Sequence, residues 1–259
     1  MAYFIRQGAN TFLATPETGG AWNPEEQHIA PMIGLLTHLT ELDHKQRDEE
    51  AALVPGRMSV EILGVLGYEP FDVEVEVVRP GRTIELVEAV CIQNGRPAVR
   101  MRTWFMAQTD TSAIAGTAFS SIPGPTVEEA LSGLGTNWSG GFVESINGYR
   151  KPGELGRGFA WWQTDTELIE SEPVSNLAAF MGLMDMTNGI VVRKDPSEVI
   201  YPNLDLTAHL FRMPEGKWLG ADVSVSFGAN GIGETHSVIH DENGPVGTCS
   251  QILTVRPRT

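Results

Sequence analysis

The sequence has few cysteines, no long apolar run and few basic residues, and each shortage excludes a class of protein. Its two cysteines, Cys91 and Cys249, lie in strand-like runs, which predicts buried free thiols rather than a disulfide framework. The most apolar candidate span, residues 174–192, is too polar to cross a bilayer because five polar side chains interrupt it: Ser175, Asn176, Asp185, Thr187 and Asn188. The first residues lack a basic region followed by an apolar core, so we expect no signal peptide and a soluble cytoplasmic protein.

Basic residues are outnumbered, because 18 Lys and Arg stand against 33 Asp and Glu and leave a net charge of −15. A nucleic-acid-binding protein normally carries a basic stripe, and an anionic membrane repels an acidic chain, so we expect neither partner. A small phosphorylated ligand is not excluded, because it needs only a few local Lys or Arg. The six histidines are too scattered for metal-ligand spacing, so we expect no metal and no cofactor.

What the sequence does have is a series of short apolar runs separated by turns that contain Gly and Pro. Runs rich in Val, Ile and Leu with partial alternation predict strands. They lie at residues 3–5, 11–15, 57–66, 71–78, 83–93 and 98–107, and again at residues 141–149, 158–164, 204–211, 218–227, 233–240 and 247–255. Helical spacing of apolar residues predicts one helix at residues 31–43, beginning at Pro31, and one at residues 175–187.

The two halves of the chain repeat one plan of two strands, a helix and four strands. Asn-Gly hairpin signals occur at Asn94 and Asn243, and Met32 and Met181 of the two helices have the same separation. A repeat of this length indicates a duplicated domain rather than a solenoid. We therefore expect an α+β protein packed with its sheets edge to edge. Its parts are an N-terminal domain at residues 1–107, a connector at residues 108–140 with a short helix near residues 127–132, and a C-terminal domain at residues 141–259.

Several segments resemble the acyl-CoA thioesterase II family. In the second half these are NLDLTAHLFRMPEGKWLG, VSVSFGANGIGETHSVIHDENG and VGTCSQILTVR, and in the first half AWNPEEQHIAPMIGLLTHL and EVEVVRPGRTIELVEA. The resemblance covers nearly the whole chain. It implies a double-hotdog fold, in which each of two tandem units wraps a curved antiparallel sheet around one long helix. It also implies hydrolysis of a fatty acyl-CoA thioester.

The resemblance further implies a hydrogen-bonded set of Asp, Thr and Gln around the hydrolytic water. The Asp falls on Asp205 and the Gln on Gln251, while the Thr falls on Ser226, a departure that keeps the hydroxyl and loses the methyl group. Asp205 would take the proton of the water as general base. The other two side chains, each with a donor and an acceptor, would fix the direction of the water, and all three would meet over one small pocket.

Substrate-binding groups are expected at the entry to the first helix and on one strand. Backbone N–H groups at a helix start favour a developing negative charge, so they are candidates for binding the thioester oxygen. The candidate residues are His28, Ile29, Ala30 and Met32, together with His209 near Asp205. The family usually has small glycine residues at this helix entry, and here they are absent. The first half carries Thr103 where the second half carries Gln251, so we expect one site per chain.

Two other functions stay open at this point. A hotdog enoyl-CoA hydratase or dehydratase needs an Asp/His pair over the substrate, which Asp205 and His209 could provide. A non-catalytic acyl-binding protein would keep the acyl channel and lack turnover. In each case the partner is a small acyl-CoA molecule, and we expect a homodimer or larger homo-oligomer, since exposed strand edges in such sheets commonly associate.

Overall fold

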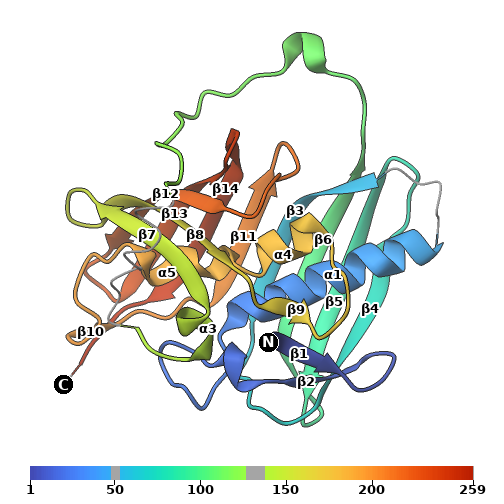
Figure 1. Ribbon diagram of the computed structural model, residues 1–259, viewed down its shortest axis with the longest axis horizontal. Helices are drawn as coiled ribbons and strands as arrows, with labels where there is room; N and C mark the ends of the chain where they lie inside the picture. Colours follow the sequence, from blue (N-terminus) through green and yellow to red (C-terminus); the bar gives the residue numbers. More distant parts are fainter. Residues whose placement is uncertain (48–52, 127–137, 259) are drawn as a thin grey trace.

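The computed structural model describes residues 1–47, 53–126 and 138–258, which form one large sheet wrapped around helices (Figure 1). The strands of the first half are β1 (Ala2–Arg6), β2 (Thr11–Ala14), β3 (Leu53–Ile62), β4 (Phe71–Arg79), β5 (Ile84–Gln93) and β6 (Arg96–Ala107). Those of the second half are β7 (Ile146–Pro152), β8 (Arg157–Thr164), β9 (Glu167–Ile169), β11 (Asp205–Leu210), β12 (Leu219–Phe227), β13 (Ile232–Asp241) and β14 (Gly244–Thr254). A separate pair, β10 (Val199–Ile200) and β15 (Arg256–Pro257), lies beside them.

Read outward from the middle of the sheet, the six strands from β3 to β1 follow the same order as those from β11 to β7, and β9 is added beyond β1. The order is β7-β8-β12-β13-β14-β11-β3-β6-β5-β4-β2-β1-β9, so β3 and β11 join the halves edge to edge as predicted. At this junction Ser59 lies opposite Thr207, and their hydroxyl oxygens are 3.2 Å apart. The β13–β14 hairpin pairs Asp241 with Gly244, so its turn is one residue earlier than the predicted Asn243-Gly244 turn.

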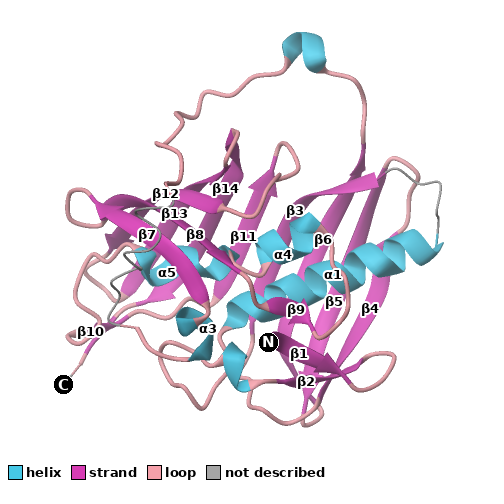
Figure 2. Cartoon of the chain, in the orientation of Figure 1, coloured by secondary structure: helices cyan, strands magenta, loops and turns pink. Residues whose placement is uncertain are grey.

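The first helix, α1 (Ile29–Arg47), is longer than predicted and lies against the concave face of the sheet (Figure 2). Pro31 is its third residue rather than its first. The first four N–H groups of a helix have no intrahelical acceptor, so a proline at this position still removes no helical hydrogen bond. The helix is buried on nearly all sides in its first three turns, because the sheet and the second helical segment enclose it. Its fully buried apolar side chains are Ala30, Met32, Ile33, Leu35 and Leu36.

The second predicted helix, at residues 175–187, is broken into short pieces. These are α4 (Asn176–Met181), a 3-10 turn η3 (Met184–Met186) and α5 (Thr187–Ile190), with Ser175 capping α4 through the Ala178 N–H. The carbonyl of Leu183 accepts a hydrogen bond from the indole of Trp162, and Gly189 has a φ of 106° that ends the helical path. Because of the break, the polar residues that follow Leu183 face the interior of the protein.

The α4 segment and α1 cross at two glycines. A Cβ on Gly34 would lie 2.8 Å from the Ala178 carbonyl oxygen and 2.8 Å from the Gly182 Cα. The backbones therefore touch at this point, which only a glycine in α1 permits. This close crossing holds the start of η3 beside α1 and so fixes where the residues after Gly182 lie.

Shorter elements complete the chain. They are the 3-10 turns η1 (Pro16–Thr18) and η2 (Ser112–Ile114) and the short helix α3 (Gly141–Glu144). The predicted strand at residues 141–149 is therefore helical at its start, and β7 begins only at Ile146. The part of the connector around η2 arches away from the body, whereas Pro123 and Gly124 accept hydrogen bonds from Trp161 and Tyr149 (Figure 1). The helix expected near residues 127–132 lies outside the described residues.

Cys91 and Cys249 are buried free thiols, as predicted. None of the helices in the described parts of the chain has the length and apolar character needed to cross a membrane.

Candidate active site

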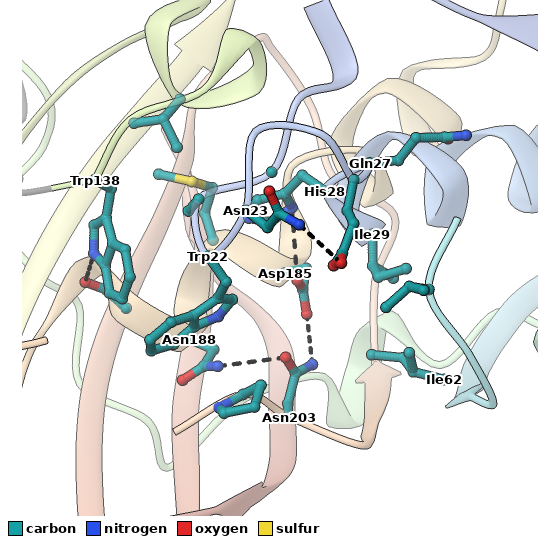
Figure 3. Close-up of a pocket in the computed structure, with 18 of the residues that line it drawn as sticks. Trp22, Asn23, Gln27, His28, Ile29, Ile62, Trp138, Asp185, Asn188 and Asn203 are labelled. Carbon is teal, nitrogen blue, oxygen red and sulfur yellow. Dashed lines mark hydrogen bonds and ion pairs between the residues drawn. The ribbon is translucent and has the colours of Figure 1, made fainter. Parts of the chain in front are cut away.

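A cavity of about 330 Å³ lies between the N-terminal end of α1 and the broken helix of the second half (Figure 3). The loop before α1 forms one wall, the segment from Asp185 to Ile190 forms another, and residues 200–203 close the third side. Most of the wall is apolar, and polar groups converge in its centre. The side chains drawn around it include Trp22, Asn23, Gln27, His28, Ile29, Ile62, Trp138, Asp185, Asn188 and Asn203.

Asp185 is the acidic group at the centre of this cavity, and its side chain is almost fully buried. Its Oδ1 accepts hydrogen bonds from Gln251 Nε2 at 2.8 Å and from Asn203 Nδ2 at 2.7 Å. Burial raises the pKa of the Asp185 carboxyl to about 6, although the two amide donors oppose this rise. The group is therefore a carboxylate at neutral pH and a stronger base than an exposed aspartate.

Gln251 is fully buried and does not line the cavity, so it contacts Asp185 from the side of the carboxyl group that faces away from the cavity. Its Oε1 lies 2.8 Å from Thr187 Oγ1, and the same hydroxyl lies 2.8 Å from the Met184 carbonyl oxygen. Both of these atoms are acceptors, so the single hydroxyl proton serves one of them at a time. The Gln251 amide thus links η3 and the start of α5 to β14 and orients the carboxylate.

Two asparagines extend the network along the cavity wall (Figure 3). Asn203 Nδ2 donates to Asp185 and also to the backbone oxygen of Asp205 at 3.1 Å. Asn188 Nδ2 lies 3.3 Å from both Asn203 Oδ1 and the Tyr201 carbonyl oxygen. Among the described residues, no partner is found for the buried Asn188 Oδ1. A buried acceptor without a partner is costly, so this oxygen favours a water or ligand donor in the cavity.

His28 faces Asp185 across the cavity, with Nδ1 3.7 Å from Asp185 Oδ2. The same Nδ1 accepts the Ala30 N–H at 3.1 Å, so it carries no proton and the imidazole caps the start of α1. The ring packs on Phe142 with centroids 4.4 Å apart, and burial lowers the pKa of His28 to about 3. The imidazole is therefore neutral throughout the physiological range.

The structure does not bring the side chains of Asp205, Ser226 and Gln251 together. All three residues border a shallow hollow on the outer face of the sheet. However, Asp205 Oδ1 accepts the Ile252 N–H at 2.7 Å and Ser226 is exposed, whereas the Gln251 amide points through the sheet to the inner face. The physical reason is strand parity: Leu206 and Val225 face the core, so their neighbours Asp205 and Ser226 must face outward.

The expected substrate-binding residues also lie in different places, and only two of them line the cavity. His28 and Ile29 line the cavity beside Asp185. Ala30 and Met32 are buried within α1 and do not line it. His209 is exposed on the outer face of the sheet, on the same side as Asp205.

Asp185 and Asn203 were missed by the sequence analysis, although the sequence contains a signal for the first. An aspartate followed by Thr187, Asn188 and Gly189 interrupts an otherwise apolar helical stretch. A lone acid in such a stretch is expensive to bury and therefore a candidate for function. No group of three or more His, Cys, Asp and Glu suited to a metal ion occurs in the described ranges.

Comparisons with known proteins agree with this architecture. Residues 120–255 match the model of the acyl-CoA thioesterase C-terminal domain, and residues 18–106 match that of the acyl-CoA thioesterase N-terminal domain. A search among curated proteins found none that matches the chain.

Solved structures with the same fold come from several bacteria. A hotdog-fold protein from Alicyclobacillus acidocaldarius has a TM-score of 0.74 at 14% identity, covering 98% of this chain and 96% of its own. An acyl-CoA thioesterase II from Mycobacterium marinum has a TM-score of 0.66 at 14% identity, covering 99% and 96%. A TesB protein from Mycobacterium avium subspecies paratuberculosis has a TM-score of 0.64 at 16% identity, covering 98% and 96%.

These structures establish a hotdog fold. Since the C-terminal domain model alone spans more than half of the sequence and the N-terminal domain model covers much of the remainder, the chain belongs to the acyl-CoA thioesterase family.

Proposed function

We propose that this protein hydrolyses acyl-CoA thioesters at the cavity that contains Asp185. One observation carries the proposal: a buried carboxylate with a raised pKa, oriented by two amides, lies at the centre of a mostly apolar cavity. Such a group is suited to remove a proton from water near neutral pH. Family membership supports thioester hydrolysis over other reactions of a carboxylate and water.

In the proposed reaction, water bound at Asp185 Oδ2 attacks the thioester carbonyl carbon and gives one proton to the carboxylate. The carbonyl oxygen becomes an oxyanion in the tetrahedral intermediate. Collapse of the intermediate breaks the carbon–sulfur bond, and the departing CoA thiolate takes the proton back from Asp185. The products are a carboxylic acid and CoA, and Asp185 returns to its starting state.

The oxyanion would be stabilised by backbone at the start of α1. Ile29 lines the cavity, and within the described residues no acceptor is found for its N–H group. The Ala30 N–H is already bonded to His28, and Pro31 has none, so the Ile29 N–H is the donor at this helix start that remains for substrate. The positive end of the helix dipole adds to its effect.

We also propose the double-hotdog arrangement, with one unit at residues 1–107, a connector at residues 108–140 and a second unit at residues 141–259. The matching strand order of the halves and their edge-to-edge junction at β3 and β11 support it. We propose one site per chain from the same comparison, because the strand registers make Thr103 the equivalent of Gln251 in the first half. Association of the chain into a homodimer or larger oligomer stays a prediction.

A hydratase or dehydratase is the second candidate, because His28 and Asp185 form an Asp/His pair in the cavity. The pair expected earlier, Asp205 and His209, lies instead on the outer face of the sheet. The low pKa of His28 argues against this candidate, since an imidazole that stays neutral to about pH 3 is a weak base, and the proton on its Nε2 is far less acidic than that of an imidazolium.

The test is release of free thiol from acyl-CoA esters of short to long chain length by the wild type and by Asp185→Asn. We expect turnover by the wild type and a loss of at least about 10³-fold in kcat for the variant. The matched control is Asp205→Asn, which removes the same charge on the outer face and should change kcat by less than about twofold. Loss of turnover in the control with an active Asp185→Asn protein would refute the site. Hydration of enoyl-CoA without thiol release would favour the second candidate.

A further inference from the structure

The side-chain amides beside Asp185 have a fixed direction, and that direction determines which of their atoms are acceptors. Asn203 Nδ2 lies 2.7 Å from Asp185 Oδ1 and 3.1 Å from the Asp205 carbonyl oxygen. Both of these partners are acceptors, so the Asn203 amide cannot be reversed without the loss of both hydrogen bonds. Its Oδ1 is therefore an acceptor as well, and it is bonded to Asn188.

The same argument fixes the direction of the Asn188 amide. Its Nδ2 lies 3.3 Å from both Asn203 Oδ1 and the Tyr201 carbonyl oxygen, and both of these atoms are acceptors. The nitrogen must therefore point toward them, and Asn188 Oδ1 points away from them. This oxygen is buried, and the described residues provide no donor for it. A chain of hydrogen bonds that starts at the Asp185 carboxylate thus ends in an acceptor that the protein does not pair.

Asn188 lies where the helical segment of the second half breaks, and it lines the same cavity as Asp185 (Figure 3). Its φ of −81° and ψ of 111° are not helical, and Gly189 follows with a φ of 106°. Asn188 is half-buried with a buried Oδ1, whereas Val65 and Arg256, which line the cavity elsewhere, are exposed. The unpaired acceptor therefore belongs to the enclosed part of the cavity, and the exposed side serves as its entrance.

The chemistry of the acyl group decides whether this acceptor is paired when substrate binds. A thioester that enters with its acyl group first brings that group to the enclosed part of the cavity. A plain hydrocarbon chain has no hydrogen-bond donor, so it leaves Asn188 Oδ1 unpaired. A hydroxyl on the acyl chain supplies the donor, and it can also accept a hydrogen bond. Trp22 lines the same cavity, and its indole N–H has no acceptor among the described residues.

We propose that the site selects acyl groups that carry a hydroxyl, and that Asn188 Oδ1 accepts the hydrogen bond from this hydroxyl. The inference rests on the proposed function and deepens it, because it names hydroxyacyl thioesters as the substrate class. A buried acceptor that the wrong substrate leaves unpaired discriminates strongly between two ligands of similar shape. Since the acceptor has one fixed direction, one enantiomer of a chiral hydroxyacyl group should be preferred over the other.

The experiment compares thiol release from butyryl-CoA with that from butyryl-CoA hydroxylated at the second, third or fourth carbon, using each enantiomer separately. For the wild type, kcat/KM should favour at least one hydroxy ester by at least about tenfold. Asn188→Leu keeps the shape and removes the acceptor, so it should reduce this ratio to less than about twofold. Asn188→Ala gives the same readout if the leucine is not accommodated.

The ratio of the two esters is the decisive quantity, because Asn188→Leu also removes the hydrogen bond to Asn203 and should lower kcat for every ester. The matched control is Asn176→Leu, since Asn176 Nδ2 donates to the Pro214 carbonyl at 2.7 Å and Asn176 does not line the cavity. This control should keep the wild-type ratio. A wild type that prefers no hydroxy ester would overturn the proposal, and so would a ratio that stays unchanged in the Asn188 variants.

A second readout separates this proposal from the hydrolase proposal. Calorimetry measures binding of the same plain and hydroxylated compounds with a methylene group in place of the thioester sulfur, which cannot be hydrolysed. Tighter binding of a hydroxylated analogue by the wild type alone, without thiol release from any ester, would support the role of Asn188 and refute hydrolysis. Thiol release at equal rates from plain and hydroxylated esters would refute the hydroxyl preference alone. In that case Asn188 would serve the hydrolytic water or another part of the substrate.

Discussion

The two halves of the chain have the same strand order around a helical core, but they differ at the positions of Asp185 and Gln251. The junction pairs Ser59 with Thr207, and the next strands pair Ser59 with Arg102 and Thr207 with Ser250. An offset of 148 residues therefore relates equivalent positions of the two halves, and Thr103 is the equivalent of Gln251. The same offset relates Gly34 to Gly182 and Thr37 to Asp185. Asp185 and Gln251, which are bonded to each other in the second half, thus each have a threonine at the matching position in the first.

This difference shows how one backbone plan holds a buried hydrogen-bond network in one copy and only local hydrogen bonds in the other. Thr37 Oγ1 bonds back to the Ile33 carbonyl of its own turn at 2.8 Å, as threonines in continuous helices do. The second half has lost helical continuity after Gly182, so Asp185 is free to bond with Gln251 and Asn203 instead. A broken helix therefore exchanges local hydrogen bonds for a network that spans three elements.

The largest expected effect comes from making the second half resemble the first. Asp185→Thr should lower kcat for thiol release by at least about 10³-fold, because the base is removed. Thr37→Val, the change at the matching position of the first half, should leave kcat within about twofold, since that hydroxyl bonds only within the first half's core. A large loss of activity in Thr37→Val would mean that the first half also takes part in catalysis.

Asp185 should also lower the stability of the protein at neutral pH. Its folded pKa of about 6 lies above the reference value of 3.8, so the folded state binds the proton more tightly than the unfolded state. The cost is absent below about pH 4, grows as pH rises toward 6 and reaches about 3 kcal/mol above that. Asp185→Asn, which keeps an acceptor for Gln251 and Asn203, should therefore unfold at higher urea than the wild type at pH 8.

The control for this prediction is the same pair of proteins at pH 3.5, where their urea midpoints should agree. A variant that is no more stable at pH 8 would indicate that the network already compensates the buried charge in full.

The helix crossing should respond unequally to the same change in its two glycines. Gly34→Ala places a methyl group 2.8 Å from backbone atoms of the other helical segment and should cost about 2 kcal/mol of folding free energy. Gly182→Ala meets its nearest atom, the Ala179 carbonyl oxygen, at 3.3 Å and should cost no more than about 0.5 kcal/mol. Denaturant unfolding of both variants checks this, and equal costs would contradict the asymmetric crossing.

Gln251→Thr should move the pH profile rather than abolish activity. Its amide donates to Asp185 and thereby lowers the carboxyl pKa, so removing it should shift the acid limb of kcat/KM upward by about one pH unit. A merely structural role would lower activity equally at every pH and leave that limb in place.

The smallest effect belongs to the counterpart of Gln251 in the first half. Thr103 is fully buried, and within the described residues its hydroxyl has no hydrogen-bond partner. Thr103→Val keeps the shape and removes the unpaired hydroxyl, so it should stabilise the protein by about 1 kcal/mol with kcat unchanged. A destabilised variant would imply that a water satisfies Thr103 in solution.

Much of the fold could be predicted from residue pattern, while the site could not. Alternation and turn residues located twelve strands with boundary errors of a few residues, because each strand buries one face and its pattern is local. The break in the second helix was missed because its causes are tertiary: contact with Gly34 and a hydrogen bond from Trp162. Asp205 was predicted from the family resemblance, and a sequence resemblance alone does not tell which face of the sheet a strand residue occupies. Gln251 was correctly placed on the strand that is now β14, but its partners are too distant in sequence to be inferred from it.

The pairing of β9 with β1 has a consequence for how the chain is made. Ala2 lies beside Glu167 and Phe4 beside Ile169, so β1 is completed by a strand that is synthesised much later than β1 itself. Until then the outer edge of β1 offers unpaired backbone groups to other chains. Contacts of such long sequence separation slow folding. The sheet of the first half is therefore complete only after part of the second half has been synthesised. A nascent first half is therefore expected to need protection of this edge during synthesis.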